Sequence, residues 1–198
     1  MRIGFDVDGV LGDYPQAYQA LIQRVTGRNL FQPGDAENPP TWYWPELRGY
    51  TKSEMQTVWE HILEAPDFWQ SLLPLPGVAA LDPLIPALED HHDVYYITAR
   101  PGRTAKRQTE RWLRRQLGYG FTPYEPTVLI SHSKDDAVWA LDLHVYIDDN
   151  LDNANAVYEH TEGHTRTYLL DRRYNQGETD ATRVPTVQAM IDLELANL

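Results

Sequence analysis

The sequence predicts an α/β protein built on a parallel β-sheet with helices on both faces. Five short strand-like segments alternate with helical segments along the chain, an order that favours a parallel sheet. The strand-like segments are short and apolar, as expected for strands covered on both sides. The alternation is interrupted once, between the first strand and Pro74. The interruption indicates a helical insertion that sits over the sheet.

The N-terminal part predicts one strand followed by the insertion. We expect the first strand over residues 3–7, where it runs into acidic residues and Gly9. Residues 14–25 carry apolar side chains at helical spacing, with Asp13 as the N-cap. Residues 27–45 form a loop by composition, and a helix capped by Ser53 is expected over residues 53–63. We therefore assign residues 14–73 to a small helical cap, and residues 1–13 and 74–198 to the α/β core.

The rest of the chain predicts the alternating core. Valine, isoleucine and tyrosine are frequent in the strand segments, and an amphipathic pattern marks the longest helix, which Gly118 closes. The expected strands cover residues 94–97, 127–130, 144–147 and 165–170. The expected helices cover residues 78–88, 103–117, 134–141 and 151–158, with a final helix beyond Pro185.

Composition excludes several classes of function. The chain has 198 residues and no cysteine, so disulfides, thiolate zinc sites and cysteine nucleophiles are ruled out. A formal net charge of −12 argues against general nucleic-acid binding, and no stable nucleic-acid complex is expected. Basic residues are nevertheless concentrated between Arg100 and Arg115. This run is interpreted first as a solvated helix face and alternatively as a local attractor for anionic ligands.

Neither a signal peptide nor a membrane anchor is expected. The N-terminus enters a strand-like run without a charged leader and a long apolar segment. The most apolar stretch, residues 72–88, is interrupted by four prolines and cannot span a bilayer as a regular helix. A cytoplasmic protein without membrane contact is the expectation. The sequence does not indicate the oligomeric state, so a homodimer stays open.

Polar residues gather where the predicted strands end. Ligands of parallel α/β sheets bind at the carboxyl ends of the strands, so these residues are candidates for one site. They are Asp6 and Asp8 after the first strand, Thr98, Ala99 and Arg100 after the second, Lys134 beyond the third, and Asp148 and Asp149 after the fourth. Each signal is weak alone, but together they predict a site at one edge of the sheet.

The chemistry of these residues favours metal-assisted phosphate transfer. Carboxylates that converge on one point repel each other unless a cation lies among them. Oxygen ligands without cysteine or a histidine cluster suit Mg²⁺. The metal neutralises phosphate charge, so that a carboxylate can approach phosphorus, while Lys134 and the hydroxyl and amides around Thr98 hold the remaining phosphate oxygens. The expected ligand is a small phosphorylated substrate, attacked through an aspartyl-phosphate.

The same residues resemble the four signature motifs of the haloacid dehalogenase-like phosphatase superfamily. In order, they are Asp6-Val7-Asp8-Gly9-Val10-Leu11, Thr98, Lys134 and Asp148-Asp149. The resemblance implies a Rossmann-like core in which Asp6 attacks phosphorus and Asp8 protonates the leaving oxygen, then activates water. It also implies that Mg²⁺ is bound by the Asp6 carboxylate, the Asp8 carbonyl and the Asp148-Asp149 pair. Adjacent residues leaving a strand point opposite ways, so we favour Asp149 as the direct ligand and place Asp148 behind it.

Within that superfamily the chain is similar to the 5′(3′)-deoxyribonucleotidase family. The resemblance implies Mg²⁺-dependent hydrolysis of nucleoside 5′-monophosphates, with deoxyribonucleotides preferred. It rests on Phe5 to Leu11 with Asp13, on Asp67-Phe68-Trp69 leading to Leu73-Pro74-Leu75-Pro76-Gly77, on Ser133-Lys134-Asp135, and on Ile147-Asp148-Asp149 with Asp152. Two departures put the exact substrate in doubt. Thr98-Ala99-Arg100-Pro101 stands where Thr-Ser-Pro is common, and Asn150 where an arginine is usual.

In that family the insertion supplies aromatic rings that stack on the base. Such stacking contributes on the order of 1–3 kcal/mol per base and tolerates different bases. The alternative is that most of these rings fill a small helical core. The candidates are Tyr14, Trp42, Tyr43, Trp44, Phe68 and Trp69.

Other functions stay open on the sequence. A polynucleotide 3′-phosphatase would use the basic run to follow a strand, although the acidic chain and the capping insertion argue against it. A sugar-phosphate phosphatase is disfavoured by the aromatic insertion. Outside the enzymes, a module could bind Mg²⁺ and a phosphorylated ligand without turnover, or the acidic cluster could be purely structural.

Overall fold

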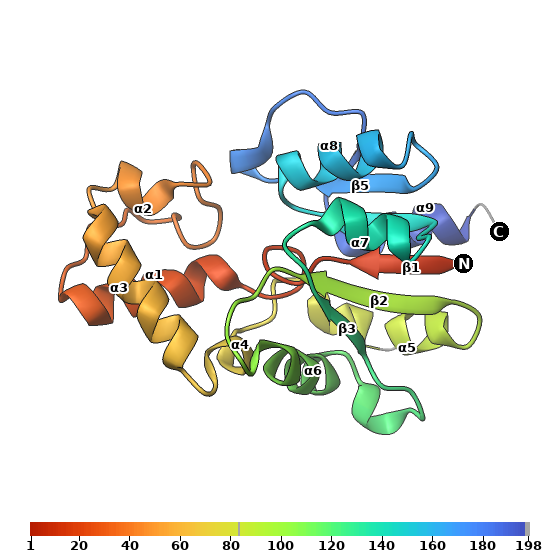
Figure 1. Cartoon of the computed structure of the whole chain (residues 1–198), viewed down its shortest axis with the longest axis horizontal. Coiled ribbons are helices and arrows are strands. Elements are labelled where there is room, and N and C mark those ends of the chain that lie inside the picture. The colour runs from red at the N-terminus through yellow and green to blue at the C-terminus, as the bar shows by residue number, and fades with distance from the viewer. Residues whose placement is uncertain (83, 197–198) are drawn as a thin grey trace.

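The computed structural model describes residues 1–82 and 84–196, and within them a six-stranded parallel sheet forms the centre (Figure 1). The strand order is β3-β2-β1-β4-β5-β6, which confirms the predicted parallel α/β fold. The strands are β1 (Arg2–Phe5), β2 (Asp93–Thr98), β3 (Thr127–Ile130), β4 (Val145–Asp148), β5 (Arg166–Leu170) and β6 (Thr182–Val184). The three-residue β6 was not predicted, because its polar sequence carries no strand pattern.

Helices cover both faces of the sheet, as predicted. Along β2 and β4 successive side chains point to opposite faces, and each face has its own core. Tyr96 and Ile147 pack into the larger core, shared with α5 (Leu84–Glu89), α6 (Ala105–Gln116) and α9 (Val187–Leu195). Ile97 and Tyr146 pack into a second core with α7 (Lys134–Ala140) and α8 (Leu151–His160). Because both sides of the strands are buried, the strand segments read as continuous apolar runs.

Residues 14–73 contain four helices and no strand. They form α1 (Tyr14–Thr26), α2 (Trp44–Leu47), α3 (Lys52–Glu64) and α4 (Phe68–Ser71). In Figure 1, α1, α2 and α3 lie together to the left of the sheet, whereas α4 lies beside α6. The backbone amide of Trp69 in α4 donates to the Gln108 side chain in α6 at 2.9 Å. The last turn of this segment is therefore tied to the sheet-bearing part of the chain.

The two predicted helix caps of this segment had different outcomes. Asp13 caps α1 as predicted, accepting a hydrogen bond from the Gln16 amide at 3.1 Å. Ser53 was the wrong cap for α3, since the helix begins at Lys52 and Thr51 caps it. Thr51 and Glu54 form a capping box, in which each side chain bonds the other residue's amide. This reciprocal pair satisfies two free amides at the helix start.

The single helix predicted over residues 78–88 is wrong. The structure has a 3₁₀ helix η1 (Val78–Leu81) and then the separate helix α5. Between them lies Pro83, which is outside the described residues; proline lacks the amide hydrogen that a continuous helix needs. Two further 3₁₀ helices, η2 (Tyr119–Phe121) and η3 (Arg173–Asn175), were not predicted. Of the helices that the structure describes, none is long and apolar enough to cross a membrane.

Candidate active site

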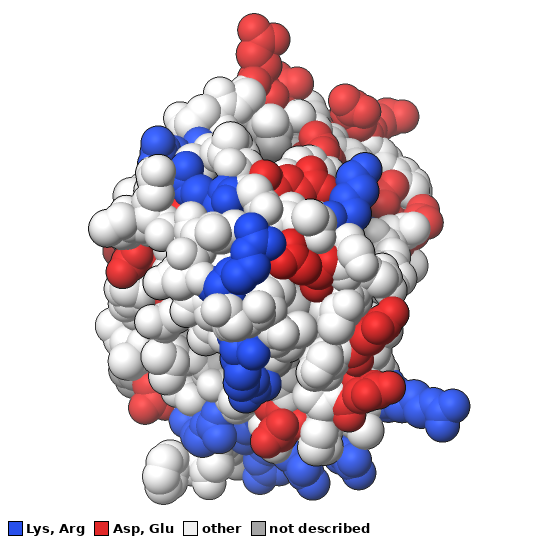
Figure 2. Space-filling view, turned by 90° about the vertical axis from the view of Figure 1, so that its left-hand side faces the viewer, with Lys and Arg blue, Asp and Glu red and all other residues white. Residues whose placement is uncertain are grey.

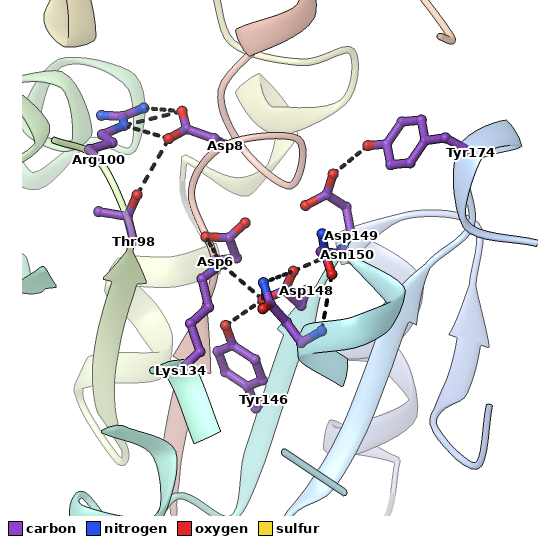
Figure 3. Close-up of polar contacts among 11 residues, drawn as sticks. Asp6, Asp8, Thr98, Arg100, Lys134, Tyr146, Asp148, Asp149, Asn150 and Tyr174 are labelled. Carbon is purple, nitrogen blue, oxygen red and sulfur yellow. Dashed lines mark hydrogen bonds and ion pairs between the residues drawn. The ribbon is translucent and has the colours of Figure 1, made fainter. Parts of the chain in front are cut away.

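The predicted site residues meet at the carboxyl end of the central strands. β1 lies between β2 and β4, so Asp6 and Asp8, which follow β1, are flanked by Thr98 at the end of β2 and Asp148 at the end of β4. The first turn of α7 brings Lys134 to the same place. Figure 3 shows these side chains converging on one region.

Lys134 is a buried cation held between two carboxylates. Its Nζ lies 2.6 Å from Asp6 Oδ1 and 2.9 Å from Asp148 Oδ2. Burial opposes the charge on Lys134, but Asp148 and Asp6 raise its pKa above the ordinary value. Burial also raises the pKa of Asp6 well above its usual range; Lys134 works against this shift, and Asp148 and Asp149 add to it. The Asp6 carboxylate therefore depends on nearby cations for its charge.

Both oxygens of Asp148 are engaged by the protein. Oδ2 accepts hydrogen bonds from Lys134 and, at 2.6 Å, from the Tyr146 hydroxyl. Oδ1 accepts from the Asn150 amide at 2.8 Å. Asp148 is fully buried, and these contacts compensate its loss of water. The geometry suits a residue that orients Lys134.

Asp149 has a free oxygen. Its Oδ2 accepts a hydrogen bond from the Tyr174 hydroxyl, whereas its buried Oδ1 has no hydrogen-bond partner. Burial raises the pKa of Asp149 to about 6, and the neighbouring Asp148 contributes in the same direction. A Cβ on Gly9, which adopts a φ of +82°, would lie 2.1 Å from Asp149 Oδ2. Only glycine fits beside this carboxylate.

The residues present fit a divalent metal ion. One oxygen each of Asp6, Asp148 and Asp149 lie within 4.8 Å of one another, and one oxygen of Asp149 has no hydrogen-bond partner. With Asp8, four carboxylates gather here, and Lys134 and Arg100 pair with them. Carboxylate ligands without thiolate or imidazole match Mg²⁺.

Arg100 pairs with a carboxylate of the site. The sequence places its guanidinium beside the phosphate site, and in the structure it is buried and pairs with Asp8, with Nη2 2.7 Å from Oδ1. The Thr98 hydroxyl also donates to Asp8, at 3.4 Å. Thr98, Ala99 and Arg100 all line the cavity described below. The sequence could not show this pairing, because the departure from the family motif says only that a cation is present.

A cavity of about 480 Å³ opens above the carboxylates and is walled by aromatic rings. Five of the six predicted aromatic residues line it: Tyr14, Trp42, Tyr43, Trp44 and Trp69. Phe68 does not, and packs edge-on against Trp69 with ring centroids 4.9 Å apart. Adjacent helical residues point about 100° apart, so α4 can direct only one of these two rings into the cavity.

Several lining residues were not identified from the sequence. Trp59 stacks on Tyr14, with ring centroids 6.4 Å apart, and its place on the apolar side of α3 was the available signal. Tyr174 lines the cavity from η3 and contacts Trp42 edge-on at 5.6 Å. The segment around Tyr174 has no periodicity and no motif, so nothing in the sequence pointed to it. Tyr18, Asn150 and Asn153 also line the cavity.

The basic run does not form one surface. Arg100 is buried in the site, whereas Lys106 pairs with Glu110 and Arg114 with Glu125 on the exposed side of α6. Figure 2 shows the side of the molecule that faces left in Figure 1, where basic side chains are interspersed with acidic ones and are most frequent along the lower edge. The first interpretation of the basic run, a solvated helix face, therefore applies to these paired residues of α6. It does not apply to the buried Arg100.

Comparisons with known proteins agree with the fold and the motifs. The family described as 5′ nucleotidase, deoxy (pyrimidine), cytosolic type C matches residues 1–197. A protein of Oceanobacillus iheyensis named "Putative nucleotidase" is 28% identical over 195 residues, covering 93% of this chain and 94% of that protein.

Two solved structures show the same fold at low identity. A HAD family hydrolase of Deinococcus radiodurans with bound phosphate and sodium is 16% identical, with a TM-score of 0.59, covering 99% of this chain and 95% of that one. A HAD-superfamily hydrolase of Geobacter sulfurreducens is 14% identical, with a TM-score of 0.56, covering 97% and 98%.

Proposed function

The chain belongs to the cytosolic type C family of deoxy (pyrimidine) 5′ nucleotidases, is a phosphatase of the haloacid dehalogenase type, and on this premise we propose its substrate and mechanism. We propose that it hydrolyses nucleoside 5′-monophosphates, with deoxyribonucleotides preferred, to a nucleoside and inorganic phosphate. The reaction depends on Mg²⁺ and passes through an aspartyl-phosphate on Asp6. The family's description as cytosolic supports a cytoplasmic location.

One observation carries the proposal. The buried Asp6 carboxylate, ion-paired to Lys134 at 2.6 Å, lies beside Asp148 and Asp149 at the base of an aromatic-walled cavity. A nucleophile, a phosphate-binding cation and metal ligands are thus within reach of one phosphate, and the volume of about 480 Å³ is in the range of small-molecule sites. An aromatic wall suits a planar base better than a sugar alone.

Two displacements complete the reaction. First, an Asp6 oxygen forms a bond to phosphorus, the bond to the nucleoside oxygen breaks, and Asp8 gives its proton to that oxygen. Second, a water oxygen attacks phosphorus, its proton passes to Asp8, and the bond to Asp6 breaks. Asp6 is regenerated and Asp8 is again protonated, so the cycle consumes only water and substrate.

Mg²⁺ would be held by the Asp6 carboxylate, the Asp8 backbone carbonyl and Asp149 Oδ1. The free buried oxygen of Asp149 supports its choice over Asp148, whose oxygens are already engaged. When bound, the ion offsets phosphate charge and lets a carboxylate approach phosphorus. The Thr98 hydroxyl, the Ala99 amide and Lys134 would hold the remaining phosphate oxygens.

The helical cap, residues 14–73, would bind the nucleoside. Tyr14, Trp42, Tyr43, Trp44 and Trp69 face the cavity above the phosphate site, and stacking on such rings tolerates different bases. The substrate enters between this cap and the sheet edge, which excludes a long strand more readily than a mononucleotide.

A substrate panel tests the proposal. Phosphate release is measured with Mg²⁺ on deoxyribonucleoside and ribonucleoside 5′-monophosphates, sugar phosphates and a 3′-phosphorylated oligonucleotide, and again with EDTA. We expect the highest kcat/KM on deoxyribonucleoside 5′-monophosphates, and no release with EDTA. Asp6→Asn should abolish release, whereas Asp136→Asn, at a side chain 70% exposed, is the matched control.

Other outcomes would redirect the assignment. A preference for the oligonucleotide would indicate a polynucleotide 3′-phosphatase, and one for sugar phosphates a sugar-phosphate phosphatase. Stabilisation by Mg²⁺ and nucleotide without turnover would indicate a binding module. Full activity of Asp6→Asn would reject the aspartyl-phosphate.

A further inference from the structure

Arg100 is an arginine with no exposed surface, and every nitrogen of its guanidinium has a protein partner. Nη2 and Nε donate to the two Asp8 oxygens at 2.7 and 2.9 Å, and Nη1 donates to the Thr109 hydroxyl at 3.0 Å. Burying a cation is costly unless it is paired and hydrogen-bonded. These contacts meet that requirement and turn the guanidinium toward Asp8 and Thr109.

The guanidinium also lies over two tryptophan rings, which limit its movement. Its central carbon lies 5.1 Å from the Trp69 ring centroid and 5.9 Å from that of Trp112. Trp69 is held by a hydrogen bond to the Pro101 carbonyl at 3.0 Å, and Trp112 by one to the Leu72 carbonyl at 2.8 Å. Stacked rings limit the rotation of a planar cation. The arginine is therefore a rigid support.

Asp6 and Asp8 are directed to different cations. Figure 3 shows the Asp6 carboxylate turned toward Lys134 and the Asp8 carboxylate turned toward Arg100 and Thr98. Without Arg100, the Asp8 carboxylate would lose the contacts that hold both of its oxygens. A two-point contact from a guanidinium fixes the plane of a carboxylate, which a lysine ammonium cannot do.

We propose that Arg100 is a positioning residue that holds the Asp8 carboxylate in the orientation for proton transfer. This rests on the proposed function, in which Asp8 protonates the leaving oxygen and later takes a proton from water. In the motif Thr98-Ala99-Arg100-Pro101, which departs from the family pattern, the guanidinium therefore serves the Asp8 carboxylate.

The role predicts a dependence on the leaving group. A nucleoside oxygen must be protonated as it departs, whereas p-nitrophenolate leaves readily without a proton. Arg100→Lys keeps the charge and loses the two-point contact. On a nucleoside 5′-monophosphate we expect kcat to fall about 10- to 100-fold with KM changed less than threefold, since positioned acid–base groups contribute about 10²–10⁴-fold. On p-nitrophenyl phosphate the loss should be about tenfold smaller.

Double variants and a matched control make the test decisive. Asp8→Asn alone should show the larger loss, and adding Arg100→Lys to it should cost less than about twofold more, because both changes act through one group. Arg111→Lys, on the exposed side of α6, should leave both rates within about twofold. Thermal denaturation of each variant confirms that the fold is retained.

Four results would overturn the proposal. Equal losses on the two substrates, or additive losses in the double variant, would make Arg100 a structural residue only. A rise in KM and in the inhibition constant of inorganic phosphate, with kcat unchanged, would make it a phosphate ligand. Absence of phosphate release by the wild type would reject the proposed function itself, and this role of Arg100 with it.

Discussion

The sheet edge and the helical cap face the same cavity with different chemistry. At the sheet edge Asp6, Lys134 and Asp148 are at most 6% exposed and are joined by ion pairs. Across the cavity Trp42 and Tyr43 are 47% and 69% exposed. Buried charges need fixed partners, whereas an aromatic ring can stack on a base without a directed bond. Changes at the edge should therefore affect stability and chemistry, and changes at the exposed rings of the cap mainly substrate affinity.

The largest effect is expected at Lys134. Lys134→Met leaves Asp6 and Asp148 buried without their counterion, and breaking a buried pair in this way costs about 3–5 kcal/mol. We expect the free energy of unfolding of the metal-free protein to fall by that amount in urea denaturation. Lys106→Met, at an exposed pair with Glu110, should change it by less than about 1 kcal/mol. Similar losses in both variants would remove the contrast between buried and exposed charge.

Tyr174 should set the affinity of the metal. Tyr174→Phe removes the hydroxyl that donates to Asp149 Oδ2, and loss of a hydrogen bond to a metal ligand commonly costs about 10- to 100-fold in affinity. The apparent Mg²⁺ dissociation constant, measured from Mg²⁺-dependent thermal stabilisation, should rise within that range. The matched control is Tyr124→Phe, because the Tyr124 hydroxyl donates to the distant Asp90. An unchanged constant would show that Tyr174 does not orient Asp149.

The metal-free protein should lose stability as the pH rises. Burial raises the pKa of Asp149 to about 6 in the folded state, so the folded protein binds a proton that the unfolded chain releases near pH 4. The resulting stability is present at low pH and is lost as the pH passes through 6, by about 1–2 kcal/mol between pH 5 and pH 7.5. Urea denaturation of wild type and Asp149→Asn checks this, and equal pH slopes would contradict it.

The smallest effect is expected in the cap. Trp42→Ala should raise KM for a nucleoside 5′-monophosphate about fivefold, as expected for a half-exposed stacking partner that supplies roughly 1 kcal/mol. Its kcat should change less than twofold, and inhibition by inorganic phosphate should stay the same, since phosphate contacts the sheet edge. A parallel loss of phosphate inhibition would show that cap and edge are coupled, through the contact of Trp42 with Tyr174.

The sequence alone determined the parallel sheet and the residues at its edge. Both follow from local order: short apolar strands alternate with helices, and Asp6, Thr98 and Asp148 stand where strands end. The parallel arrangement then brings those ends together whatever the details of packing. The aromatic rings of the cavity were instead implied by the family resemblance, in which the inserted segment supplies rings that stack on the base.

Only the tertiary structure decided the partners of individual side chains. Arg100 holds Asp8, Tyr174 holds one oxygen of Asp149, and the other oxygen is left free. Periodicity assigns a residue to a face or an edge, but a hydrogen bond depends on directions and on distances near 3 Å. Tyr174 reaches Asp149 from a 3₁₀ turn in a segment without periodicity. Such contacts arise when distant segments pack together, and the order of residues along the chain does not specify them.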